Sequence, residues 1–166
     1  MIRDKATYRE SVIDDRNAIF ELHSLAFGRE DEASLTNALL SAEPLKTIDL
    51  VAELDGRIMG HVLLTELEGP DRALALAPVA VHPDWRDLQI GTELIRRALD
   101  MARQRGWRSV FVLGDTVFYG RFGFRSDLAD CVDCPFQGPN FMALELEPGA
   151  LFGYAGKLVY PAPFMG

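Results

Sequence analysis

Apolar residues follow two different spacings along this chain, and the change of spacing predicts where strands and helices lie. The stretch Ala6–Ser11 predicts a first strand. A helical spacing follows, which Asp14 or Asp15 can cap and which Gly28 ends. A second, shorter helix is predicted at Asp31–Leu40. The positions expected to face the core are Ile19, Leu22, Leu25 and Ala26 in the first helix, and Leu35 and Leu39 in the second.

A hairpin is predicted at the dipeptide Asp55-Gly56, because a type I′ turn needs positive φ at both central residues. The strands on either side are predicted near Leu50–Leu54 and at Arg57–Leu67. After a turn, the run RALALAPVAV (72–81) predicts a third long strand. Pro78 within that run cannot donate a ladder hydrogen bond, which predicts a bulge or an unpaired edge there.

The apolar spacing becomes helical again from Ile90 and stops at Gly106. Strands are predicted after it at Ser109–Leu113 and Phe141–Glu147. A strand–helix–strand order implies a parallel, right-handed crossover. We therefore predict an α/β (α+β) fold, with a mixed sheet that is antiparallel early and parallel late, and helices on its faces. The stripe of the long helix comprises Ile90, Leu94, Ile95, Ala98, Met101 and Ala102.

Composition indicates one globular domain over 1–166, since 48% of the 166 residues are hydrophobic and 25% are charged. No run of about eighteen apolar residues is present, and the start MIRDKATYRE lacks the apolar core of a signal peptide. We therefore expect a cytoplasmic protein without a membrane partner. The net charge of −8 argues against nucleic acid as a partner, because backbone phosphates are bound by clustered Lys and Arg.

A metal site is not expected. Cys131 and Cys134 form a lone CVDC without a second ligand pair, and no two histidines have the H-x₃₋₅-H spacing. The pair precedes Pro135 in a loop-like region, whereas a redox pair is expected at the start of a helix beside a strand. We predict two reduced structural thiols.

The segment 135–166 is rich in Pro, Gly and aromatic residues, and it is too apolar to remain free in water. It can cover the sheet, line a pocket or form a contact between two copies of the chain, and the sequence leaves these three alternatives open.

The loop Trp85–Gly91, directly before the Ile90 helix, is a candidate anion site. A helix N-terminus carries unpaired N–H groups and a partial positive charge, so a phosphate is stabilised there without any lysine. Most helix N-termini bind only water, and this loop does not by itself identify a ligand.

The order strand, loop, helix, strand and then DTVFYGRFGF resembles the GNAT superfamily of N-acetyltransferases over nearly the whole chain. The loop pattern of that family, Q/R-x-x-G-x-G/A, reads here as Arg86 to Gly91, with Gln89 in place of the middle glycine. The resemblance implies a mixed sheet of six to seven strands with about four helices. It also implies acetyl-CoA as the acyl donor and an amine of a small molecule or peptide as the acceptor.

The resemblance also assigns residues to the donor site. Val79, Ala80 and Val81 would pair with the pantetheine arm along a splayed strand. The amides of Arg86, Asp87, Leu88, Gln89, Ile90, Gly91 and Thr92 would hold the pyrophosphate. Gln89 either tolerates a changed backbone or fills part of the phosphate site, and its amide can also donate to a phosphate. Asp87 opposes phosphate binding unless it points to solvent.

In the family, a tyrosine four residues before the Gly-Phe pair protonates the leaving thiolate, and Tyr119 stands at that position. Its alternative role is ordinary aromatic packing. An N–H near Val81 would polarise the carbonyl. The candidates for the general base are His61, Glu66 and Asp71, with weaker claims for His23 and His82.

These assignments predict an N-acetyltransferase in which the amine attacks directly within a ternary complex. One alternative is a non-catalytic binding module with a weakened or lost coenzyme A site, which Gln89 and Asp87 favour and Tyr119 disfavours. Another is an enzyme that transfers a longer acyl group or uses an alcohol acceptor. A homodimer is compatible with each of them.

Overall fold

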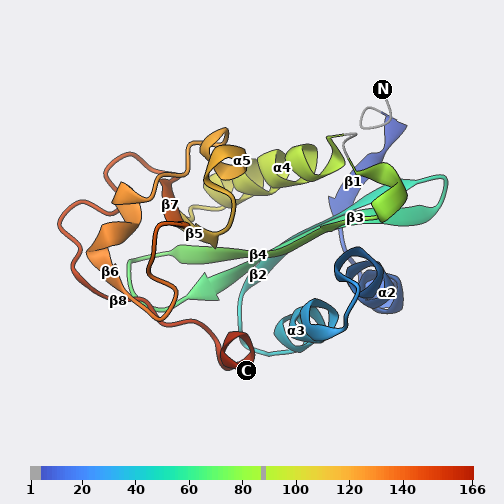
Figure 1. Cartoon of the computed structure of the whole chain (residues 1–166), viewed down its shortest axis with the longest axis horizontal. Coiled ribbons are helices and arrows are strands. Elements are labelled where there is room, and N and C mark those ends of the chain that lie inside the picture. The colour runs from blue at the N-terminus through green and yellow to red at the C-terminus, as the bar shows by residue number, and fades with distance from the viewer. Residues whose placement is uncertain (1–4, 87–88) are drawn as a thin grey trace. The chain divides into compact units, whose positions relative to one another are not determined.

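Six strands form one mixed sheet in the computed structural model, which describes residues 5–86 and 89–166 (Figure 1). Neighbouring strands are hydrogen-bonded in the order β1 (Thr7–Glu10), β2 (Thr47–Leu54), β3 (Arg57–Leu67), β4 (Ala73–Val81), β5 (Ser109–Leu113) and β7 (Phe141–Glu145). β1 with β2, β2 with β3, and β5 with β7 pair antiparallel, whereas β4 and β5 pair parallel. The predicted mixed sheet is confirmed.

Residue contacts divide the chain into two units. The first contains Met1–Thr65 and Ala77–Ala98, and the second contains Glu66–Leu76 and Leu99–Gly166. The α-helices are α2 (Arg16–Phe27), α3 (Asp31–Leu40), α4 (Ile90–Gln104) and α5 (Thr116–Gly120). Within the two described ranges, no helix is both long enough and apolar enough to cross a membrane.

In the first unit, the β2–β3 hairpin turns as predicted, because Asp55 has a φ of 52° and Gly56 a φ of 76°. β2 starts at Thr47, earlier than the predicted Leu50. Gly60 and His61 are neighbours on β3, so they face opposite sides of the sheet. A Cβ on Gly60 would lie 2.8 Å from Leu94 of α4, whereas the His61 ring contacts His23 of α2. α4 and α2 therefore cover opposite faces of β3.

The apolar stripe of α4 is confirmed, since its members are buried except for half-buried Met101. Two expectations for α2 are wrong. Asp15 does not cap the helix with its side chain; its carboxylate instead accepts the Val12 N–H and pairs with Arg9. Leu25, expected in the core, is 54% exposed, and His23 is buried in the same helix.

In the second unit, Phe111 and Phe141 stack in a core to which the C-terminal segment contributes. β8 (Gly156–Lys157) pairs with β6 (Val132–Asp133), and Phe136, Tyr160 and Phe164 pack against the same core. The segment 135–166 therefore covers the core of the second unit, which is one of the three alternatives given for it. Phe152 is an exception, because 93% of it is exposed. Both cysteines are free, and burial raises the pKa of each thiol.

Candidate functional site

The carboxyl-terminal half of β4 extends past its pairing with β5. In the described parts of the chain, that pairing runs from Ala73–Ser109 to Ala75–Phe111 and does not reach Pro78. The unpaired backbone predicted at Pro78 is therefore present on the β5 side. Val79 and Val81 are half-buried, Ala80 is buried, and the strand ends at Val81. Backbone in this position has N–H and C=O groups available for an extended ligand.

The loop after β4 enters α4 through Gln89, whose φ is +63°. This is the left-handed conformation that glycine adopts most readily. Gln89 thus keeps the backbone conformation expected of the glycine it replaces, and its residue is exposed. Asp87 and Leu88 lie outside the described residues, so the expectations for these two positions stay predictions.

The first turn of α4 has the form required of an anion site. The Glu93 N–H donates to the Gln89 carbonyl over 3.0 Å. The amides of Ile90, Gly91 and Thr92 precede it, in the turn where a helix supplies no acceptors. Gly91 lies against Val81, since a Cβ at this position would be 3.4 Å from the Val81 side chain. The helix start and the strand end are therefore adjacent.

Tyr119 is positioned by a short, firmly capped helix in the second unit. The carboxylate of Asp115 accepts the N–H groups of Val117 and Phe118 at 2.8 and 3.1 Å, and α5 follows. The Tyr119 ring is buried and lies so close to Gly114 that a Cβ there would be 2.6 Å from it. It also packs edge-on against Phe118 and Phe124.

The pKa of Tyr119 is raised, mainly by burial and further by the negative charge of Asp115. The phenol therefore stays protonated at neutral pH and can donate a proton. Aromatic packing and proton donation were alternative roles for Tyr119 in the sequence. In the structure the same side chain can have both.

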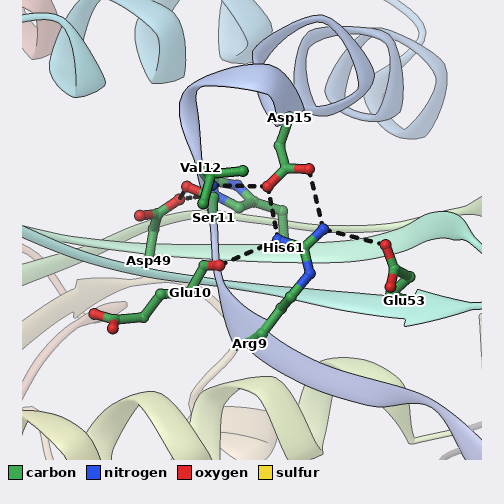
Figure 2. Close-up of polar contacts among 8 residues, drawn as sticks. All are labelled: Arg9, Glu10, Ser11, Val12, Asp15, Asp49, Glu53 and His61. Carbon is green, nitrogen blue, oxygen red and sulfur yellow. Dashed lines mark hydrogen bonds and ion pairs between the residues drawn. The ribbon is translucent and has the colours of Figure 1, made fainter.

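His61 lies in the middle of a buried hydrogen-bond chain. Its Nε2 is 2.8 Å from Asp49 Oδ2, which also accepts the Ser11 hydroxyl at 2.5 Å (Figure 2). Its Nδ1 is 2.9 Å from Nε2 of His23, and both rings are fully buried. Both nitrogens of His61 are thus occupied by protein groups, so a proton taken from a ligand would have to reach it through His23 or Asp49.

The contacts determine the tautomers in this chain. With one proton on each ring, both contacts are satisfied when His61 donates its Nε2–H to the Asp49 carboxylate and its Nδ1 accepts the Nε2–H of His23. His23 Nδ1 then carries a lone pair, and in the described part of the molecule no donor reaches it. Burial lowers the pKa of His23 to about 3, with a further contribution from His61, so the ring is neutral at physiological pH.

A cluster of ion pairs, which was not predicted from the sequence, lies beside the hydrogen-bonded residues His23, His61 and Asp49. Arg9 binds Asp15 at 2.8 Å and Glu53 at 3.1 Å (Figure 2). The hydrogen bond from Arg9 is the main cause of the lowered pKa of Asp15. Nothing in the local spacing of the sequence indicates this cluster, because the partners lie on different elements.

Asp15 and Glu53 also line a pocket of about 410 Å³ between α2 and the β2–β3 hairpin. Apolar residues of α2, including Leu22 and Leu25, form part of its wall. Because Arg9 binds both carboxylates, its positive charge offsets part of the negative charge of the pocket, which Glu21 also lines.

The candidate base residues are thus separated. His61 and His23 are buried together, whereas His82 is half-buried at the start of the loop, where its Nδ1 accepts the Asp84 N–H. Glu66 and Asp71 both belong to the second unit.

Comparison with known sequences is consistent with this geometry. The profile of the Acetyltransferase (GNAT) family matches residues 13–124. The Uncharacterized N-acetyltransferase YjhQ of Escherichia coli (strain K12) is 35% identical over 123 residues, which cover 70% of this chain and 67% of that relative. The Probable N-acetyltransferase camello of Xenopus tropicalis is 34% identical over 113 residues, which cover 63% of this chain and 51% of that relative.

Two solved structures are similar over almost the full chain. The GNAT family N-acetyltransferase YhbS from Escherichia coli, in complex with CoA, has a TM-score of 0.90 and 27% identity, covering 98% of this chain and 93% of that one. A GNAT family acetyltransferase from Brucella melitensis, in complex with acetyl-CoA, has a TM-score of 0.81 and 28% identity, covering 96% and 97%.

Proposed function

Because this chain belongs to the GNAT acetyltransferase family, we propose that it transfers the acetyl group of acetyl-CoA to a primary amine of a small molecule or peptide. The amine attacks directly, with donor and acceptor bound together. Two similar structures that hold CoA and acetyl-CoA support this choice of donor. A cytoplasmic location is part of the same proposal.

The observation that carries the proposal is the left-handed Gln89 in front of α4. Its conformation lets the amides of Ile90, Gly91 and Thr92 face one anion, and the Thr92 hydroxyl adds a further donor. Val79 to Val81 supply strand backbone next to this helix start, where a pantetheine arm would pair. These residues fit the phosphate and the amide arm of coenzyme A without a lysine.

The chemistry requires a neutral amine, a donor for the oxyanion and a proton for the leaving sulfur. We assign the oxyanion contact to the backbone N–H near Val81, and the proton to Tyr119. Burial supports the second assignment, because a phenol with a raised pKa stays protonated at neutral pH and so still carries the proton that the leaving sulfur takes up.

A ligand-binding experiment tests the proposal. Acetyl-CoA at about a hundred times its dissociation constant should stabilise the protein by about 2.7 kcal/mol, measured as a rise in melting temperature. Acetyl-pantetheine, which lacks the pyrophosphate, should stabilise it much less. An amine panel with acetyl-CoA should then give acetylated product, detected by mass spectrometry.

The outcomes of this test separate the alternatives. If coenzyme A species bind and no amine is acetylated, a binding module is supported instead. If neither CoA nor acetyl-CoA changes the melting temperature, the proposed donor site is wrong.

A further inference from the structure

The loop between β4 and α4 is held at two points by other elements of the first unit. At its start, the His82 N–H donates to the Met59 carbonyl of β3 over 2.8 Å, and the Trp85 N–H donates back to the His82 carbonyl over 2.8 Å. Further along, Nη2 of Arg86 donates to the Ala26 carbonyl of α2 over 2.5 Å. The loop is thus bound to β3 and to α2.

The Ala26 carbonyl is a strong acceptor for a cation. It is one of the last four carbonyls of α2, which lack partners inside the helix and carry the negative end of its dipole. The Gly28 N–H donates to the Ser24 carbonyl, and α2 has no basic residue in its last turn. Arg86, which is 60 positions away in the chain, supplies that cation.

α2 is itself fixed to β3 by the buried chain of His23, His61 and Asp49. His61 lies two positions from Met59 on β3, and His23 lies about one helical turn from Ala26 on α2. The three elements therefore form a closed set of contacts: β3 to the loop through Met59, the loop to α2 through Arg86, and α2 to β3 through His23.

We propose that Arg86 is a positioning residue for coenzyme A. Its guanidinium holds the loop against the end of α2, and the buried histidine pair fixes α2 where that contact can form. The phosphate is then bound by backbone amides, not by the Arg86 side chain. This inference rests on the proposed function, because it concerns the same donor site.

The alternative is that Arg86 leaves Ala26 and binds the phosphate directly. The two roles share the Ala26 contact in the ligand-free protein and differ in the complex with coenzyme A, where only a positioning residue keeps that contact. They differ again in their dependence on His23, because a direct phosphate contact does not need α2.

Amide hydrogen exchange by NMR on the ligand-free protein tests the contact. Arg86→Leu should speed exchange of the His82 and Trp85 amides by about tenfold, the effect of losing one charge-assisted hydrogen bond. Arg86→Lys should restore part of the protection, because lysine can still donate to the carbonyl. Arg96→Leu, which removes an exposed arginine of α4, is the matched control and should leave both amides unchanged.

Steady-state kinetics test the consequence. Arg86→Leu should raise KM for acetyl-CoA about tenfold with little change in kcat. His23→Leu should reduce the additional effect of Arg86→Leu, because α2 is no longer held in place. His23→Gln, which keeps a donor for His61, is the control, and in it Arg86→Leu should keep its full effect on KM.

Unchanged exchange of the two amides in Arg86→Leu, or fully additive effects with His23, would overturn the proposal. If the wild-type protein does not bind coenzyme A, the proposed function fails, whereas the exchange experiment still decides whether Arg86 restrains the loop.

Discussion

Tyr119 shows how a single residue can be fixed by packing and still have a chemical role. Its ring is enclosed by Gly114, Phe118 and Phe124, and Asp115 caps the helix that carries it. The same burial that fixes the ring also raises the pKa of its hydroxyl.

Replacing Tyr119 with phenylalanine should therefore separate the two roles. The ring is kept, so the melting temperature and the affinity for acetyl-CoA should stay close to those of the wild type. Loss of the general acid should lower kcat by about a hundredfold or more. Tyr8→Phe is the control and should leave kcat unchanged, since the ring that stacks on Arg97 is retained. Equal turnover of Tyr119→Phe and the wild type would remove Tyr119 from the mechanism.

The sequence indicated Tyr119 and the loop because their neighbours follow a fixed local pattern. It could not show that His61 is buried against His23, 38 positions away, with Asp49 on its other side. Long-range pairs of this kind depend on how helices and strands pack, and local spacing carries no information about them. The role of Arg9 between Asp15 and Glu53 was missed for the same reason.

At the scale of elements, hydrophobic spacing predicted most boundaries closely, and it did so best where one face is fully buried. The stripe of α4 is an example, whereas the exposed Asp55-Gly56 turn was predicted from the positive φ that its residues adopt. α2 was predicted less well, because it places a polar histidine in the core and leaves Leu25 exposed. Its apolar spacing therefore identified only part of its buried face, Ile19 and Leu22.

The contact between β3 and α4 depends on the absence of a side chain at Gly60. A Cβ there would lie 2.8 Å from Leu94 and 3.0 Å from Ile90, both fully buried. Gly60→Ala should lower the free energy of unfolding by about 1–3 kcal/mol, the range seen for overpacked cores. Chemical denaturation measures this value.

A matched control for Gly60→Ala is available at Gly138, where an added Cβ meets nothing within 4 Å. Gly138→Ala should change the free energy of unfolding by less than about 0.5 kcal/mol. If Gly60→Ala were equally neutral, the close approach of α4 to β3 would not be a constraint on the fold.

At the scale of the whole molecule, the neutral, buried His23 makes stability depend on pH. Its folded-state pKa of about 3 lies below the ordinary value of 6.5, so below pH 6.5 only the unfolded chain takes up this proton. Above that pH the contribution is fully present. It is lost progressively as the pH falls from about 6.5 toward 3.

Between pH 7 and 5, His23 alone should lower the free energy of unfolding by about 2 kcal/mol, at about 1.4 kcal/mol per pH unit below 6.5. Urea denaturation at both pH values measures the change. His23→Gln should show a smaller loss over this range, since the titrating group is gone. An identical loss in both proteins would assign the acid sensitivity to other groups.

The left-handed backbone at Gln89 has a consequence for how proteins of this kind are identified. A search that demands glycine at this place in the loop rejects the present chain, although its main chain adopts the required turn. In the proposed donor site, glutamine is tolerated because φ decides whether the amides converge, and Gln89 is an exposed residue with the left-handed φ that this needs. Signatures written as permitted torsion angles would recover members that signatures written as letters overlook.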